Sequence, residues 1–239
     1  MVIRRPAALL AAVAGSLPHC FDPELVRVLL PLHPEVRIKS ITGQVVPPRP
    51  GQTPSRRYLA YGSSITNGFA AAKPADAYPA RISRLLGVDS LNLGLGGGAH
   101  LEPAIAEFIA GRDDWDFASL EMGINLLGGT HTVDEFRSRV AGFLPHIAQR
   151  RRDKWIFCID LFTCIDDVRA NPVITEYRTI VREAVKALDS PRLVYLDGRR
   201  LLTDLAGLST DLLHPTSEGF AEIATRLATE MKRAMGNAG

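Results

Sequence analysis

From Arg57 onward, short apolar runs alternate with longer segments whose apolar residues recur at helical spacing. Strands of a parallel sheet are buried on both faces, so they are apolar throughout, and each is joined to the next by a helix. The alternation therefore predicts a three-layer α/β/α fold around a doubly wound, five-stranded parallel sheet. The expected strands are Tyr58–Tyr61, Ser90–Leu93, Phe117–Met122, Trp155–Leu161 and Leu193–Asp197, and the expected helices are Tyr78–Leu86, Pro103–Ala110, Val133–Gln149, Val173–Leu188 and Ser217–Met235.

The region before Arg57 has a different pattern. Val26–Leu30 and Glu35–Lys39 favour two strands joined by a turn that contains proline and histidine. Val46–Pro54 holds four prolines and a glycine, which suit neither a helix nor a central strand. We therefore expect residues 1–56 to form a small strand-rich segment with a linker, and residues 57–239 to form the main domain.

The first residues have the outline of a short signal peptide. Arg4 and Arg5 precede the apolar stretch Ala7–Ala14, whose end could serve as a cleavage site. The stretch is short for that role, and no run in the sequence is long enough to span a bilayer. The sequence favours a cytoplasmic protein over a secreted one and predicts no membrane partner, and it carries no signal for the oligomeric state.

Charge and cysteine content exclude further classes. The chain has 28 basic and 26 acidic residues, so little net field attracts nucleic acid, and we expect no such partner. The basic run Gln149–Lys154 is expected to be a solvated helix end. Cys20, Cys158 and Cys164 are too few and too irregularly spaced for a disulfide framework or a zinc site. Cys158 lies in an apolar run and is expected in the core.

A serine pair follows the first expected strand. In Gly62-Ser63-Ser64-Ile65 it lies in a glycine-bracketed turn at the carboxyl end of that strand, the edge where open α/β sheets bind their ligands. A Gly-Ser-Ser turn by itself is more often only a turn and a helix cap.

A glycine-rich segment, Asn92–His100, follows the second strand, and its backbone N–H groups can approach a bound group closely. It also permits an alternative interpretation. Gly94-x-Gly96-x-x-Ala99 is a degenerate dinucleotide fingerprint, and Glu121 lies near the spacing of an acid that binds a ribose. That interpretation needs a helix to begin at once, whereas Pro103 favours a later start.

Two further segments supply polar side chains. Gly123-Ile124-Asn125 follows the third strand, which would place an amide at the same edge of the sheet, although an asparagine in a turn is also common. Asp211 and His214 precede the last helix. In a tight turn Asp211 can accept a hydrogen bond from Nδ1–H of His214, which leaves Nε2 free to take a proton from serine. Shaping the helix entrance with Pro215 explains the segment equally well.

Together the four segments resemble the SGNH (GDSL-type) hydrolase family, whose motifs supply in order a serine, a glycine, an asparagine and a histidine. The resemblance extends from Arg57 to Met235. It assigns Ser64 as the nucleophile and leaves Ser63 where an acid often stands. Tyr61–Thr66 resembles one branch of the family, which carries Tyr-Gly-Ser-Ser-Ile-Thr there.

The resemblance carries over to the remaining motifs with two departures. The glycine motif maps onto Gly97, with the adjacent Gly96 and Gly98 as alternatives. In the third motif Leu126 replaces an aspartate, while Asn125 is kept. In the same branch the catalytic domain often follows a β-sandwich module, and the sequence 25–41 looks like the last hairpin of one.

The resemblance implies a serine hydrolase. Ser64, Asp211 and His214 would form the triad, and the N–H groups of Ser64 and Gly97 with the amide of Asn125 would form the oxyanion hole. No metal or organic cofactor is expected. The implied substrate is a small-molecule ester or thioester, with small acyl and carbohydrate acetyl esters first. An acyltransferase with the same triad and a dinucleotide-binding protein remain as alternatives.

Overall fold

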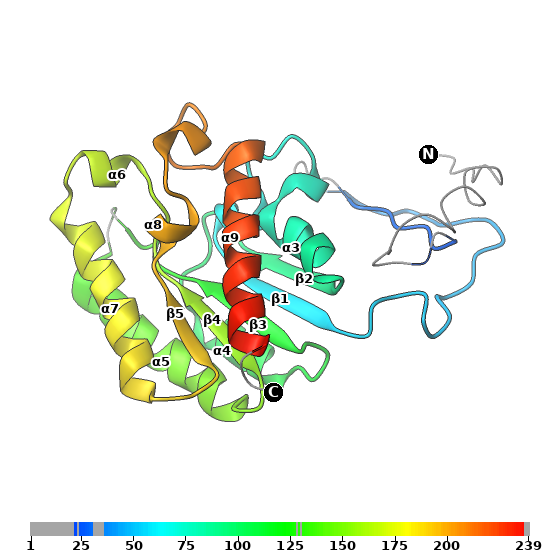
Figure 1. Cartoon of the computed structure of the whole chain (residues 1–239), viewed down its shortest axis with the longest axis horizontal. Helices are drawn as coiled ribbons and strands as arrows, with labels where there is room; N and C mark the ends of the chain where they lie inside the picture. The colour runs from blue at the N-terminus through cyan, green and yellow to red at the C-terminus, as the bar shows by residue number, and fades with distance from the viewer. Residues whose placement is uncertain (1–21, 23, 31–35, 128, 130, 237–239) are drawn as a thin grey trace.

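The computed structural model of the chain describes residues 22, 24–30, 36–127, 129 and 131–236. Five strands form one all-parallel sheet in the order β2-β1-β3-β4-β5 (Figure 1). Each lies within two residues of its predicted bounds, so the predicted fold class is confirmed. The strands are β1 (Arg57–Gly62), β2 (Asp89–Gly94), β3 (Phe117–Glu121), β4 (Trp155–Ile159) and β5 (Leu193–Leu196).

Helices cover both faces of the sheet. The longer ones are α3 (Tyr78–Leu86), α4 (Pro103–Gly111), α5 (Val133–Arg150), α7 (Pro172–Leu188) and α9 (Ser217–Gly236), and the short elements are α2 (Ser64–Asn67), η1 (Pro74–Asp76), α6 (Ile165–Val168), α8 (Gly198–Leu201) and η2 (Leu205–Gly207). Helices α3 and α9 pack together on one face, and α4, α5 and α7 pack on the other (Figure 1). All five predicted helices are present. Their starts follow local rules, since Pro103 and Pro172 occupy first helical positions and Thr132 caps α5.

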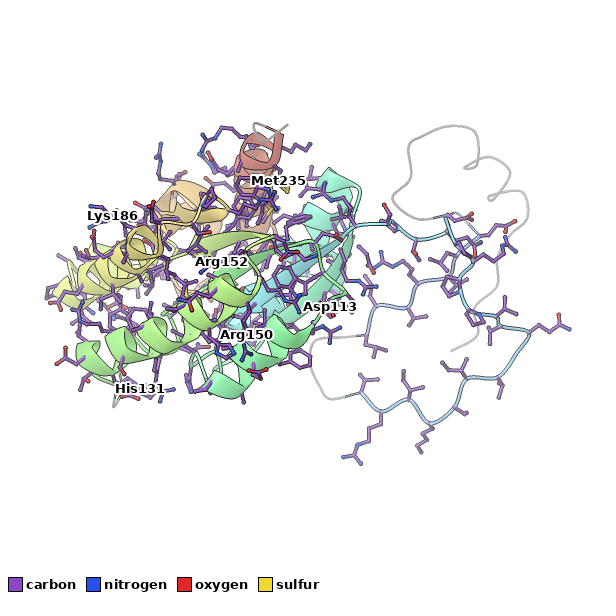
Figure 2. All side chains as sticks on the ribbon, turned by 90° about the horizontal axis from the view of Figure 1, so that it is seen from below. Asp113, His131, Arg150, Arg152, Lys186 and Met235 are labelled. Atoms are coloured by element: carbon purple, nitrogen blue, oxygen red, sulfur yellow. The ribbon has the colours of Figure 1, made fainter. Side chains whose placement is uncertain are left out.

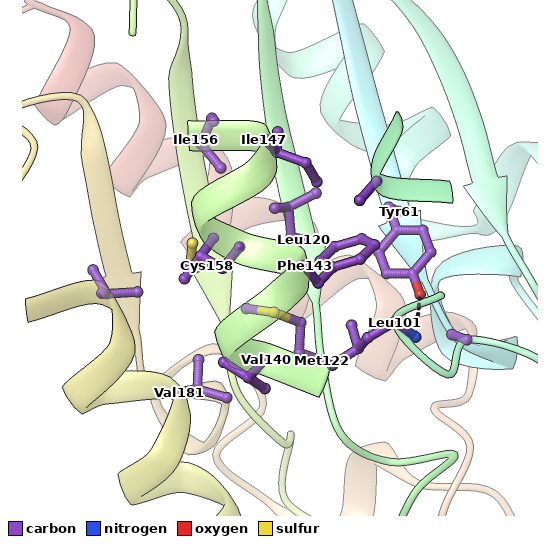
Figure 3. Packing of buried hydrophobic residues seen from close by; sticks show 14 of the residues in the cluster. Tyr61, Leu101, Leu120, Met122, Val140, Phe143, Ile147, Ile156, Cys158 and Val181 are labelled. Atoms are coloured by element: carbon purple, nitrogen blue, oxygen red, sulfur yellow. Dashed lines mark hydrogen bonds between the residues drawn. The ribbon is translucent and has the colours of Figure 1, made fainter. Parts of the chain in front are cut away.

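The strand period of two divides the core into two layers. Along β1, Tyr58 and Ala60 belong to the cluster under α3 and α9, whereas Leu59 and Tyr61 belong to the cluster under α4, α5 and α7. Tyr61 lies against Phe143 of α5 with ring centroids 5.0 Å apart (Figure 3). Its hydroxyl accepts a hydrogen bond from the N–H of Leu101, which ties the segment after β2 to the core.

The strand order determines where a site can form. The chain passes from β1 to β2 on one side and then returns to β3 on the other side of β1. At such a switch point the segments that follow the strands diverge and leave a crevice at the carboxyl edge of the sheet. The turns after β1, β2 and β3 therefore all meet at this edge.

The two strands expected before Arg57 are not found in the described residues, because 26–30 and 36–49 pair with no strand. The segment is extended and lies to one side of the α/β domain (Figure 2), and its apolar side chains are exposed, Ile38 to 60% and Val46 to 83%. A two-stranded hairpin with no apolar surface to cover is marginal in water, so the strand-like pattern alone does not form one. The expected turn, the signal-peptide stretch and Cys20 lie outside the described residues.

Two other expectations concern the domain itself. The basic run lies at the end of α5, where Figure 2 labels Arg150 and Arg152. Arg150 pairs with Glu107, and Arg151 pairs with Asp113 at 2.7 Å. Cys158 is fully buried in β4, as predicted.

Among the helices in the described part of the chain, none is long and apolar enough to cross a bilayer.

Candidate active site

The turn between β1 and α2 distinguishes the two serines. Ser63 is only 1% exposed, and its hydroxyl accepts a hydrogen bond from the N–H of Ile65, so it caps α2. Ser64 is the first residue of α2 and is partly exposed. At this position its own N–H has no partner within the helix. Of the pair, Ser64 is the more exposed, and its hydroxyl lies within hydrogen-bond distance of His214.

Ser64, His214 and Asp211 form a continuous chain of hydrogen bonds. Ser64 Oγ lies 2.8 Å from His214 Nε2, and His214 Nδ1 lies 2.6 Å from Asp211 Oδ2. Because an ionised carboxylate only accepts, the ring hydrogen belongs on Nδ1, and Nε2 is left as the acceptor for the serine hydroxyl. The structure thus brings Ser64 against His214, which lies 150 positions later in the sequence.

The segment from Asp211 to His214 is a tight turn. Leu212 has a φ of 54°, in the left-handed region that a residue with a branched side chain rarely adopts. This conformation lets Asp211 Oδ1 accept hydrogen bonds from the N–H groups of Leu213 and His214, both at 2.9 Å, and from the Ser209 hydroxyl at 2.8 Å. Backbone strain is commonly found at functional sites. Here the strained residue lies beside the imidazole of His214.

These contacts control the charge of Asp211. Partial burial raises the pKa of Asp211, but the hydrogen bonds from His214, Leu213 and Ser209 outweigh it and hold this pKa well below its ordinary value. Asp211 therefore stays ionised throughout the mildly acidic and neutral range.

This predicts a simple pH dependence. For the base predicted at His214, neutral imidazole is the active form, so kcat/KM should rise with pH, and Asp211 should add no acidic step of its own. Initial rates at low substrate concentration, measured across the pH range in which the fold is intact by circular dichroism, provide the check. Activity that increases on acidification would contradict the arrangement.

The glycine-rich segment narrows the oxyanion assignment. The N–H of Gly98 donates to the Leu95 carbonyl, so it is committed to a turn and not available to a substrate. Gly97 has a φ of 70°, which this turn requires and which glycine adopts without strain. A Cβ added to Gly96 would lie 3.9 Å from Ser64 Cβ, so the turn passes directly beside the serine. Gly97, with Gly96 as the alternative, remains the predicted donor.

Asn125 faces the same segment from the turn after β3. Its Oδ1 accepts a hydrogen bond from the N–H of Ala99 at 3.1 Å. Since an N–H can only donate, this contact determines which end of the amide is the oxygen and leaves the Nδ2 hydrogens for another partner. Gly123 makes the turn possible, because its φ is 121° and an added Cβ would lie 2.9 Å from Leu161 Cδ1.

Sequence reasoning missed two neighbours of the triad. The ring of Phe69 lies against His214, with centroids 4.6 Å apart, and helps to hold the imidazole in place. Glu121, considered above as an acid for a ribose, is only 2% exposed and accepts hydrogen bonds from Ser63 and Thr66 beneath the turn that carries Ser64. Helix α4 begins only at Pro103. The hydrogen bonds of Glu121 and the late start of α4 both argue against the dinucleotide interpretation.

Two further observations concern metal binding and the cysteines. Within the described residues, no group of three or more His, Cys, Asp or Glu side chains could hold a metal ion. Cys158 and Cys164 are buried and unpaired, and burial raises the pKa of both thiols, so both favour the protonated form.

The sheet order, together with serine, glycine, asparagine and histidine segments at one edge, defines the SGNH class of α/β fold. A match to a family model shows which family of that class includes this chain. The model of the GDSL-like lipase/acylhydrolase family matches residues 60–221, and the chain belongs to this family.

Solved structures with the same fold superpose on most of this chain. A protein described as a GDSL-like lipase from Bacteroides ovatus is 28% identical with a TM-score of 0.67, and the match covers 79% of this chain and 56% of that one. A salicylyl-acyltransferase from a tetracycline biosynthetic pathway is 25% identical with a TM-score of 0.66, and the match covers 76% and 55%. The chain thus spans little more than half the length of either.

A family two carbohydrate esterase from Clostridium thermocellum is 15% identical with a TM-score of 0.64, over 80% of this chain and 67% of that one, which shows a common fold. No curated protein sequence matches the chain.

Proposed function

We propose that the chain is a serine esterase or acylhydrolase that cleaves an ester or thioester through an acyl-enzyme intermediate. The observation that carries the proposal is the hydrogen-bonded chain from Asp211 through His214 to Ser64, with distances of 2.6 and 2.8 Å. Family membership supports the same chemistry.

The reaction follows from the acceptor at Nε2. His214 removes the proton from Ser64 Oγ as that oxygen attacks the acyl carbonyl, and Asp211 stabilises the imidazolium that forms. The imidazolium then returns its proton to the departing alcohol or thiol. A water molecule, deprotonated by the same imidazole, cleaves the acyl enzyme and restores the serine.

The developing oxyanion needs hydrogen-bond donors. We assign three: the N–H of Ser64 at the start of α2, the N–H of Gly97 in the glycine turn, and the side-chain amide of Asn125. Each belongs to a turn that is held by other hydrogen bonds, so the donors are arranged before the substrate arrives. No step requires a metal ion or an organic cofactor.

The proposed substrates are small molecules, with small acyl esters and carbohydrate acetyl esters first. The carbohydrate esterases among the structural neighbours support this order through the shared fold only. Acyl transfer to an alcohol is the second candidate, favoured by the similarity to a salicylyl-acyltransferase. Both reactions use the same triad and differ in whether water or an alcohol attacks the acyl enzyme.

We expect the purified protein to hydrolyse p-nitrophenyl esters, faster for acetyl or butyryl than for long acyl groups. The measurement is a panel of acetate to decanoate esters, acetylated xylo-oligosaccharides and acetyl thioesters, with products quantified in the presence and absence of added alcohols. EDTA in a parallel series should leave rates unchanged, because the mechanism uses no metal. An acylated alcohol as the main product would favour the transferase, and no acyl transfer from any donor would contradict both candidates.

We further propose that residues 1–56 are related to a β-sandwich module and its proline-rich linker, and that residues 57–239 are the hydrolase domain. The family match, which begins at residue 60, supports the boundary. We also propose that neither nucleic acid nor a membrane is a partner, and that the protein acts in the cytoplasm.

A further inference from the structure

A buried carboxylate lies beneath the nucleophile turn. Glu121 ends β3, the strand next to β1, and its Oε2 accepts a hydrogen bond from the N–H of Ser63 at 2.6 Å and from the Thr66 hydroxyl at 3.0 Å. Both contacts belong to the short segment that carries Ser64. One residue before the nucleophile and one two positions after it are therefore held by the same oxygen atom.

The backbone around this oxygen is shaped to admit it. A Cβ on Gly62 would lie 2.3 Å from Glu121 Oε2 and 2.2 Å from Thr66 Oγ1, so only glycine leaves room for the contact. Thr66 is fully buried, and its Oγ1 lies 2.7 Å from the hydroxyl of Tyr78 in α3. Because Thr66 donates its own hydrogen to Glu121, the Tyr78 hydroxyl donates to Thr66. The two hydrogen bonds thus run in one direction, from Tyr78 through Thr66 to the carboxylate of Glu121.

The proposed mechanism gives Glu121 no chemical step, and its position is energetically unfavourable. Burial raises the pKa of the Glu121 carboxyl, although the Ser63 and Thr66 donors oppose that rise. An apolar side chain of similar size would fill this part of the core without such desolvation. A carboxylate here is therefore expected to serve the turn that it contacts.

We propose that Glu121 is a positioning residue for the nucleophile. Acting through the Ser63 N–H and the Thr66 hydroxyl, its carboxylate fixes the turn on both sides of Ser64, so that Ser64 Oγ lies opposite His214 Nε2 and the Ser64 N–H points into the oxyanion site. Small displacements at a reacting centre carry large rate penalties, because attack requires near-contact geometry. The inference rests on the proposed function, since it assigns a role within that site.

Two variants at Thr66 separate positioning from packing. Thr66→Val keeps the shape of the side chain but removes the hydroxyl, whereas Thr66→Ser keeps the hydroxyl and removes a methyl group. We expect Thr66→Ser to retain kcat within about twofold, and Thr66→Val to lose kcat by roughly tenfold with KM nearly unchanged, because only the turn geometry is altered. The rate of covalent labelling by a fluorophosphonate should fall in parallel with kcat.

Glu121→Met tests the carboxylate itself. Methionine keeps a similar length and volume but removes the oxygen that accepts hydrogen bonds from both the Ser63 N–H and the Thr66 hydroxyl, so we expect a kcat loss on the order of 10- to 100-fold with little change in KM. Glu183→Met, at an exposed position on α7, is the matched control for loss of a carboxylate and should behave as wild type. Melting temperatures of all variants identify any that fail to fold, and for these the Thr66 pair decides.

The outcomes are distinct. Equal kcat for Thr66→Val and Thr66→Ser, or wild-type kcat in folded Glu121→Met, would overturn the positioning role while leaving the proposed function intact. Wild-type protein that neither reacts with the fluorophosphonate nor cleaves any ester would overturn the proposed function and this inference together. The order wild type, Thr66→Ser, Thr66→Val in kcat, with unchanged KM, supports the role.

Discussion

Ser64→Ala is expected to lower kcat by about 10⁴- to 10⁶-fold and to abolish covalent labelling by a fluorophosphonate. Without Oγ no acyl enzyme can form, and the residual rate reflects only the remaining donors and substrate binding. The fold should persist, since Ser64 is partly exposed and its hydroxyl contacts only His214 among the described residues. Labelling of wild-type protein with mass-spectrometric mapping of the adduct, alongside esterase kinetics, gives both readouts.

The neighbouring serine provides the matched control. Ser63→Ala removes the cap on α2 and should reduce the stability of the protein by about 1 kcal/mol, yet labelling at Ser64 should remain. An adduct located on Ser63, or an active enzyme that forms none, would show that the nucleophile is assigned to the wrong residue.

The fold was predictable because its signals are local. Each strand of a parallel sheet is a short apolar run, as in Phe117–Glu121, and proline or a capping residue marks the start of most helices. The N-terminal segment shows the limit of that logic. Its alternating apolar residues suit a strand, but a strand exists only when a partner supplies hydrogen bonds and a surface to cover, and neither property is encoded in the segment itself.

The candidate site likewise contains residues whose roles could be predicted from the sequence and residues whose roles could not. The pairing of Asp211 with His214 was predictable because both lie in one tight turn. That Ser64 and His214 meet at one edge of the sheet was predictable because the pattern implied a doubly wound sheet. The role of Glu121 was not. Its contact with Ser63 depends on the register of β1 against β3, and without that register an acid after a strand suits a ribose equally well. The Phe69 ring over His214 likewise depends on how two separate turns pack.

Asn125 offers the other large effect, because removal of an oxyanion donor affects the transition state more than the bound ester. Asn125→Ala is expected to lower kcat by about 10²- to 10³-fold, equivalent to roughly 3–4 kcal/mol of barrier, with a much smaller change in KM. Steady-state kinetics on a short-chain ester and thermal melting of the same preparation are the two measurements. A residue that only shaped the turn would instead lower the melting temperature and leave kcat nearly intact.

A second substitution separates the two ends of the amide. The oxygen of Asn125 holds the N–H of Ala99, and the nitrogen is the proposed donor. Asn125→Asp keeps an acceptor for Ala99 but places a second acceptor, with a negative charge, where the donor stood. If the nitrogen stabilises the oxyanion, this variant should melt near the wild-type temperature and still lose at least as much kcat as Asn125→Ala. A folded Asn125→Ala protein whose kcat falls by less than about threefold would remove Asn125 from the oxyanion hole, because a donor in that position contributes far more.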